Sequence, residues 1–385
     1  MSFTEVRKVI ITGFAMFAML FGSGNVIFPL ILGRDSGNQV LFGLMGFLLT
    51  AVLVPLMGLF STLLSHGDYK NLLAPLGKIP SFFIILLCMM LLGPFAVTPR
   101  CITISYAAIK MQAPSLSLLA FSMLCAGIIF LCTIKNSLIV DLLGKFLGPL
   151  KIVLLFFIIL KGLFSPANLL PVHLTKMEGF TQGLFSGYGT CDLLGTIFLS
   201  GLMLSGLHKG MHPEKKKDSW YIIKWGLQAS LMGGVLLGLV YAGFGIVAGF
   251  YGQQLATVDR ADIFSSLAVL VLGEQGGLLA NITVAISCLA TAIALTAMFA
   301  MYLHKDLSGG RLSYLVSLII TTVITVCMST LGFSGIMNAL GPVIQVIYPL
   351  LIVYTLWNIG DKLWKLKTHQ PVSLTMQPES SDWEE

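Results

Sequence analysis

Two short stretches rich in glycine and polar residues interrupt apolar segments that are otherwise long enough to cross a bilayer. The first, within residues 21–29, holds Gly22, Ser23, Gly24 and Asn25. The second, about 165 residues later, holds Gly187, Tyr188, Gly189, Thr190, Cys191 and Asp192. Such residues weaken a helix and free peptide groups at a depth where water cannot satisfy them. A matched pair of broken helices in the two halves of a chain indicates the binding site of a secondary transporter.

A broken helix leaves a partly negative end on its first half and a partly positive end on its second half. In the first stretch, carbonyls near Ala18–Gly22 are predicted to bind a cation or ammonium group, and amides near Ser23–Val26 a carboxylate. In the second stretch, carbonyls near Phe185–Gly187 and amides near Gly189–Leu193 offer the same pair. A zwitterionic α-amino acid would match both ends of both breaks.

The rest of the predicted pocket is apolar. Val26, Tyr188 and residues of the third and eighth apolar segments would surround the side chain of the bound molecule. The sequence therefore predicts an apolar amino acid as the transported molecule.

Two charged residues fall at membrane depth, where a charge is a functional hypothesis by default. Asp192 is interpreted as a cap for the second half of its broken helix, with Thr190 as another cap residue, or as a contact for the substrate ammonium or a gate, and both roles could hold at once. Arg100 is expected to pair with a carboxylate, to bind backbone carbonyls or to extend toward the interface. The sequence does not choose among these three.

A hydroxyl-bearing segment provides a second candidate site. Ser287 and Thr291 could join the carbonyls of the first broken helix around Na⁺, a hard cation that takes oxygen ligands. The alternative is that these hydroxyls bond to the backbone of their own helix, as Ser and Thr in membrane helices often do.

The composition is that of a membrane protein. Only 10% of the 385 residues are charged, 56% are apolar and the mean hydropathy is +0.91. The net charge of +6 is assigned to loops that face membrane lipid, so no nucleic-acid partner is expected. The seven cysteines are interpreted as small packing residues, and no metal cluster or cofactor is expected. Windows of about 20 apolar residues predict an all-α integral membrane protein with ten spans: 9–32, 41–64, 81–109, 116–133, 138–163, 180–206, 220–248, 277–303, 312–331 and 334–358.

The ten spans divide into five plus five, so the second half must insert upside down relative to the first. The predicted membrane domain covers 1–364, with one repeat over 9–163 and the other over 180–358, and broken helices 1 and 6. Fourteen Lys and Arg residues lie on the side of both termini and five on the other, which places both termini in the cytoplasm. Residues 365–385 are predicted to form a disordered cytoplasmic tail.

Over nearly its whole length, the sequence resembles the branched-chain amino acid:cation symporters of bacteria (the LIVCS family). The resemblance rests on Gly13-Phe14, on the stretch 21–29, on Gly93-Pro94 with 96–100, on 187–192, and on Ile347-Tyr348-Pro349. It implies the fold of the leucine transporter with its five-plus-five inverted repeat, and the bacterial cytoplasmic (inner) membrane. It also implies import of leucine, isoleucine and valine by alternating access, with Na⁺, or H⁺ in some relatives.

The resemblance also implies roles for particular residues. The stretch Gly22–Asn25 would hold the substrate carboxylate, and Tyr188 would close over it. Na⁺ would bind the carbonyls of Ala18, Phe21 and Ser287 and the hydroxyl of Thr291. The chain departs from the family pattern at Ala290, where a second hydroxyl is expected, and in lacking helices 11 and 12.

Two other functions are alternatives to symport. An ion-independent uniporter or channel for small neutral solutes is the alternative that the missing hydroxyl at Ala290 favours. An intramembrane enzyme would need clustered catalytic or metal-binding side chains at membrane depth, whereas the six histidines lie in loops or at helix ends. The protein is therefore predicted not to be an enzyme. The sequence does not rank the three amino acids, because one methylene changes affinity by only about 1–3 kcal/mol, nor does it give the stoichiometry or the oligomeric state.

Overall fold

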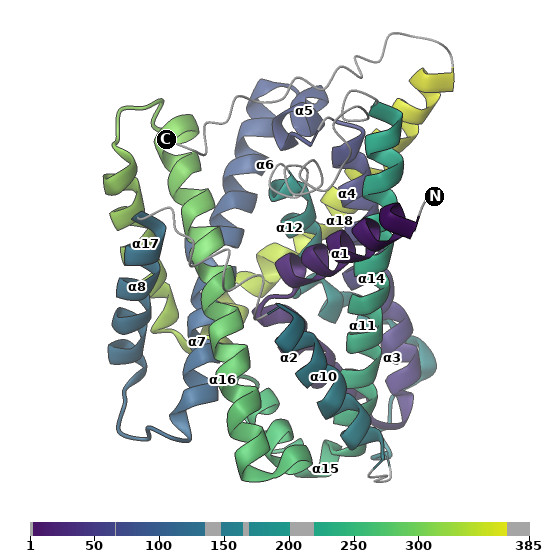
Figure 1. Ribbon diagram of the computed structural model, residues 1–385, viewed down its shortest axis with the longest axis vertical. Coiled ribbons are helices and arrows are strands. Elements are labelled where there is room, and N and C mark those ends of the chain that lie inside the picture. Colours follow the sequence, from purple (N-terminus) through teal and green to yellow (C-terminus); the bar gives the residue numbers. More distant parts are fainter. Residues whose placement is uncertain (1–2, 66, 135–147, 165–168, 201–218, 368–385) are drawn as a thin grey trace.

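Helices make up the regular structure of the computed structural model (Figure 1), which describes residues 3–65, 67–134, 148–164, 169–200 and 219–367. No strand occurs within these ranges. Among the described residues, five helical stretches are long and apolar enough to cross a membrane: Ser23–Leu63, Lys78–Lys110, Ile223–Phe250, Ile263–Leu307 and Gly332–Lys365. Shorter apolar helices accompany them. The predicted all-α membrane class is confirmed.

Both predicted breaks are present. The first apolar segment forms two helices, α1 (Phe3–Leu20) and α2 (Ser23–Ser36), which run in different directions in Figure 1. The sixth segment forms α11 (Lys176–Tyr188) and α12 (Asp192–Phe198). Cys191, between them, has a φ of 61° and is the one non-glycine residue with positive φ in the described part of the chain. A left-handed residue cannot continue an α-helix, so the second break is fixed in the backbone.

The remaining segments form the other helices, with two further interruptions. Gly93 has non-helical backbone angles and precedes Pro94, which has no N–H to donate, so the third segment kinks there. Gly273, with a φ of 78°, interrupts the helix of the eighth segment. The helices are α3 (Val40–Leu48), α4 (Val54–Leu63), α5 (Tyr69–Leu73), α6 (Lys78–Met90), α7 (Val97–Lys110), α8 (Leu118–Ile134), α10 (Gly148–Leu163), α14 (Ser219–Phe250), α15 (Gly252–Leu255), α16 (Ile263–Tyr302), α17 (Tyr314–Ser329) and α18 (Gly332–Lys367).

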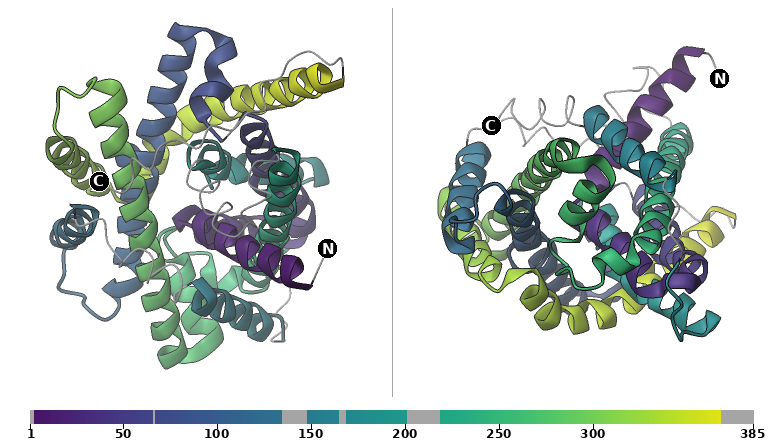
Figure 2. Two further views of the ribbon diagram at one scale, coloured as in Figure 1. Left: turned by 45° about the horizontal axis from the view of Figure 1, so that its top comes forward. Right: turned by 90° about the horizontal axis from the view of Figure 1, so that it is seen from below.

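The packing partners exchange between the two halves of the chain. Helices α1 and α2 pack on α14, the second span of the second half, while α11 and α12 pack on α3 and α4, the second span of the first half. The third spans α7 and α16 pack together, as do the fourth spans α8 and α17, which lie side by side at one edge of the molecule (Figures 1 and 2). Finally, α10 packs on α14 and α16, and α18 on α4 and α7. Two repeats related by a two-fold axis require this exchange.

Several predicted boundaries shift. Helix α16 begins at Ile263, whereas the eighth span was predicted to begin at residue 277. The difference arises because the residues before Gly273 also form a helix. Helix α18 continues to Lys367, so the predicted tail starts too early. The predicted disorder of the rest of that tail, and parts of the segments 138–163 and 180–206, lie outside the described residues.

Candidate functional site

The two breaks lie directly against each other. A methyl group added at Gly24 would lie 3.0 Å from the Cα atom and 3.1 Å from the carbonyl oxygen of Thr190. On the next turn of α2, the Phe28 ring packs on Gly189. Only a glycine at position 24 allows the backbones of α2 and of the second break to come this close. The prediction that the two spans break opposite each other is confirmed.

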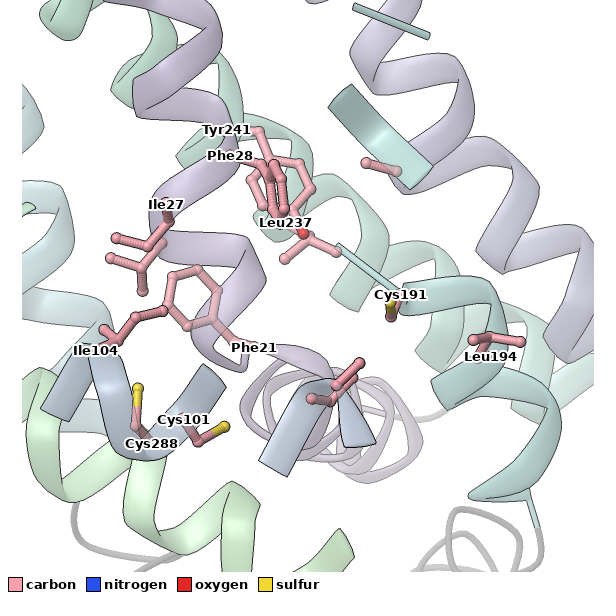
Figure 3. Packing of buried hydrophobic residues seen from close by; sticks show 14 of the residues in the cluster. Phe21, Ile27, Phe28, Cys101, Ile104, Cys191, Leu194, Leu237, Tyr241 and Cys288 are labelled. Carbon is pink, nitrogen blue, oxygen red and sulfur yellow. The ribbon is translucent and has the colours of Figure 1, made fainter. Parts of the chain in front are cut away.

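A buried polar cluster joins the two broken helices to α14. The Asn25 amide nitrogen donates to both carboxylate oxygens of Asp192, at 2.8 and 3.0 Å, and the Tyr241 hydroxyl donates to Asp192 Oδ2 at 2.7 Å. All three side chains are buried. Figure 3 shows Tyr241 and Leu237 of α14 beside α2. A buried carboxylate requires donors of this kind, so Asp192 ties α2, α12 and α14 together.

The structure corrects the interpretation of Asp192 as a helix cap. Its carboxylate oxygens bond to Asn25 and Tyr241, and no side-chain cap from Cys191 is present at the start of α12. Thr190, the other cap residue considered, does accept from the Asp192 amide, at 3.4 Å, and donates to the Gly187 carbonyl at 2.9 Å. Thr190 therefore performs the capping, and Asp192 the cross-linking.

The expected free peptide groups at the second break are also corrected. The carbonyls of residues 186–188 accept from the amides of residues 189–191, which closes the break as a tight turn. The Leu193 amide donates to the Tyr348 hydroxyl at 3.2 Å. With the Asp192 amide capped by Thr190, every amide from 189 to 193 has a partner. In this conformation the second break offers the substrate no free amide.

The first break retains more open groups. The Gly22 amide donates to the side-chain oxygen of Asn25 at 3.0 Å, so Asn25 caps the break and does not turn its amide toward a ligand. The next amides, of Ser23 and Gly24, have no partner in their own helix because they begin α2. Ser23 is buried, and its hydroxyl accepts a weak hydrogen bond from the Cys101 thiol at 3.4 Å. The carboxylate site predicted over Gly22–Asn25 loses the Gly22 amide to this cap, and the rest of the site stays a prediction.

Arg100, on α7, reaches the second break. Its Nη1 donates to the Gly189 carbonyl at 2.8 Å, and its guanidinium lies 5.7 Å from the centre of the Phe28 ring. This is the second of the three expectations for Arg100, binding to a backbone carbonyl. The side chain is fully buried, and its Nε and Nη2 have no hydrogen-bond partner among the described residues. A positive group with unused donors therefore lies beside both breaks.

A cavity of about 540 Å³ extends from the breaks between α11 and α18. Tyr188, at the end of α11, lines it and stacks on Tyr348 with ring centres 4.9 Å apart. The other lining residues include Phe28, Gln182, Phe185, Ser186, Gly189, Arg260, Met337 and Asn338. Val26, predicted to line the pocket with Tyr188, is instead buried in the core, and Gly187 packs on Thr50.

Three of the four residues predicted to bind sodium, Phe21, Ser287 and Thr291, lie around the first break, but a lysine contacts two of them. The ammonium of Lys151, on α10, donates to the Phe21 carbonyl at 3.1 Å and to the Ser287 hydroxyl at 2.9 Å. Thr291 lies next to the first break, since a methyl group at Gly22 would be 3.4 Å from its Cγ2. Its hydroxyl donates to the Ser287 carbonyl at 3.2 Å, the own-backbone alternative stated above. Ala18 lies in the last turn of α1. Sodium at this place stays a prediction.

Reasoning from the sequence missed three contributors to the site, namely Tyr241, Lys151 and Tyr348. Lys151 carried a usable signal, because a lysine in an apolar span is costly and marks function. Tyr348 lies in a segment used only for the family resemblance. Tyr241 gave no signal, because an aromatic residue in an apolar run predicts packing.

The family model for branched-chain amino acid transport proteins matches residues 5–377 of this chain. The chain belongs to that family. It is 28% identical to the branched-chain amino acid permease BraB of Bacillus subtilis over 94% of this chain and 81% of that protein. It is likewise 28% identical to the branched-chain amino acid permease BrnQ of Escherichia coli K12, over 93% of this chain and 81% of that one. These relatives are transport proteins, and the chain is a multi-pass membrane transporter, not an enzyme.

A solved structure shows the same fold. The transporter Mhp1 of the nucleobase-cation-symport-1 family, solved in a closed conformation with bromovinylhydantoin bound, superposes with a TM-score of 0.57. The match covers 87% of this chain and 74% of that one at 13% identity, so it supports the fold alone. The predicted leucine-transporter-like architecture is thereby confirmed.

Proposed function

We propose that this protein imports branched-chain amino acids by alternating access, driven by a cation gradient of Na⁺ or H⁺. The observation that carries the proposal is the direct contact of two broken helices, joined through Asp192, in a chain of the branched-chain amino acid transport family. The carriers with which it is aligned are named for the same substrates. Leucine, isoleucine and valine are therefore the substrates to test.

The groups around the breaks suit a zwitterion with an apolar side chain. The first amides of α2 and the unpaired nitrogens of Arg100 are donors for a carboxylate. The aromatic rings of Phe28, Phe185 and Tyr188 line the adjoining cavity and match an aliphatic side chain. Neither the carboxylate donors nor the aromatic rings alone would select the substrate, so the proposal needs both.

The cavity favours access from one side of the membrane. It lies along α11, whose first half precedes the break, and it includes Arg260, which follows α15. With both termini in the cytoplasm, as the distribution of Lys and Arg predicts, these residues face the outside of a bacterial cytoplasmic membrane. We infer that this conformation is open toward the exterior, and that Phe28 and Tyr188 separate the cavity from the interior side.

The function is tested by uptake of radiolabelled leucine into proteoliposomes that contain the purified full chain. Sodium and proton gradients are imposed separately, and protein-free liposomes are the control. The proposal expects saturable uptake that unlabelled isoleucine and valine inhibit and that at least one gradient stimulates. Uptake that ignores both gradients would indicate the uniporter alternative, and no uptake of any of the three amino acids would refute the proposal.

Arg100 gives a test of the substrate carboxylate site. We expect Arg100→Gln to lower leucine uptake about tenfold or more, because it removes the positive charge beside the breaks. Thermal unfolding of the purified variant, followed by intrinsic fluorescence, checks that the protein remains folded. Arg311→Gln, in the exposed loop before α17, is the control. Uptake by Arg100→Gln within twofold of wild type would remove Arg100 from the proposed site.

A further inference from the structure

Lys151 is buried where the first break meets α16, and its surroundings are those of a bound cation. Its side chain extends from the first turn of α10 and contacts the Phe21 carbonyl, the Ser287 hydroxyl and the face of the Phe21 ring, which lies 4.8 Å from the ammonium. The residue is only 4% exposed. No carboxylate forms an ion pair with it in the part of the chain that the structure describes.

Each of these partners stabilises positive charge. The Phe21 carbonyl lies at the end of α1, where the helix dipole is negative. The ring face carries the negative part of the aromatic quadrupole. A lysine buried without a carboxylate is costly unless such groups replace water. The structure therefore provides a place for one cation at the first break, and the ammonium of Lys151 takes it.

The same place was predicted for Na⁺ from the family resemblance. Of the sodium ligands that the resemblance implies, the Phe21 carbonyl contacts the ammonium directly. Ser287 contacts the ammonium through its side-chain hydroxyl, while its carbonyl accepts from the Thr291 hydroxyl. A second cation about 4 Å away would be strongly repelled in a medium of low polarity. The Thr291 hydroxyl is bonded to its own helix, and Ala290 supplies no oxygen in its side chain. These residues do not fit a sodium ion in addition to Lys151.

We propose that the ammonium of Lys151 is a built-in replacement for the sodium ion at the junction of α1, α10 and α16, so that transport by this protein does not require Na⁺. This inference rests on the proposed function and narrows it. If Na⁺ is not required, H⁺ is the one candidate coupling ion that remains of the two proposed. Lys151 is a positioning residue here. It holds the end of α1 against α16 by binding the Phe21 carbonyl and the Ser287 hydroxyl together.

The test is leucine counterflow in proteoliposomes preloaded with unlabelled leucine, which needs no ion gradient, in NaCl and in choline chloride. We expect wild-type rates within twofold of each other in the two salts. The counterflow rate of Lys151→Ala is expected to be at least tenfold lower than that of the wild type in choline chloride, because no cation then occupies the site of the ammonium. The control Lys161→Ala, an exposed lysine on the same helix, is expected to match wild type.

The sodium response separates a cation role from a purely structural one. In Lys151→Ala the vacated oxygens become open to an ion, so NaCl is expected to raise its unfolding temperature relative to choline chloride, while the wild type shows no change. A wild-type counterflow stimulated more than threefold by NaCl would overturn the proposal. The proposal would also be overturned if Lys151→Ala showed counterflow at the wild-type rate in choline chloride, or if NaCl did not change the unfolding temperature of that variant.

The failure of the proposed function has a different signature. If the wild type shows no leucine counterflow in either salt, the substrate assignment fails. The sodium inference is then decided by the unfolding temperature of the wild-type protein, which needs no substrate. An equal temperature in NaCl and choline chloride supports it, and a higher temperature in NaCl contradicts it. This comparison also holds if Lys151→Ala does not fold.

Discussion

Leucine uptake is expected to fall about 100-fold when Asp192 is replaced by alanine. The substitution removes the acceptor for both Asn25 and Tyr241, so the Tyr241 hydroxyl loses its acceptor and Asn25 keeps only its hydrogen bonds with Tyr241 and the Gly22 amide. Each such loss costs roughly 1–3 kcal/mol, and about 1.4 kcal/mol corresponds to a tenfold change in an equilibrium. Because Asp192 connects the two breaks, the cost falls on the arrangement that forms the proposed site. The measurement is the initial rate of leucine uptake into proteoliposomes at matched protein content.

The controls distinguish loss of the cross-link from general loss of a carboxylate. Asp306→Ala removes a surface partner of Lys70, an exposed pair that contributes little to stability, and is expected to leave uptake unchanged. Tyr241→Phe removes one of the donors to Asp192 and is expected to lower uptake less than Asp192→Ala does. The double variant Asn25→Ala with Asp192→Ala should lose less than the sum of the two single losses, because the two side chains share one interaction, although Asn25→Ala also removes the cap on the Gly22 amide. Near-normal uptake by Asp192→Ala, or additive losses in the double variant, would contradict this role.

The architecture was predictable because it depends on features that the sequence displays directly. Apolar length gives the spans, and Gly22 with Asn25 marks a break that no packing argument explains. The equal division of the spans implies the two-fold exchange of packing partners, which the structure shows. Composition and hydropathy therefore lead to the fold without reference to any particular contact. The interruption at Gly273 was missed because the predicted eighth span starts at residue 277, after the polar and glycine-rich run 273–277, so the helix before Gly273 was not recognised.

The contacts within the site were less predictable, because each depends on the distance between segments far apart in the chain. Asp192 was recognised as functional, but its partners lie on α2 and α14, and periodicity along the chain carries no information about them. The peptide groups of the second break were expected to be free. Their satisfaction by the turn and by Tyr348 follows from the left-handed conformation of Cys191. A charge buried in a span indicates that a partner exists, but it does not identify that partner.

Replacing Gly24 with alanine is expected to lower leucine uptake about 10-fold to 100-fold. The added methyl group would lie 3.0 Å from the Thr190 Cα atom and 3.1 Å from its carbonyl oxygen, and both atoms belong to backbone that cannot rotate away. Overpacking of this kind costs roughly 1–3 kcal/mol. The strain falls on the contact between the two breaks, so Gly24→Val should abolish uptake. Uptake rates and unfolding temperatures of both variants provide the measurement.

The matched control is Gly195→Ala, a glycine in α12 near the other break. Its added methyl group would lie 3.8 Å from Leu20, an ordinary contact, so uptake should remain at the wild-type level. Helix propensity alone favours alanine over glycine by about 1 kcal/mol at interior helical positions. If propensity decided the outcome, both variants would be neutral or stabilised. Loss of uptake in Gly24→Ala with none in Gly195→Ala therefore points to the contact between the breaks, whereas normal uptake in both would show that this contact opens without affecting transport.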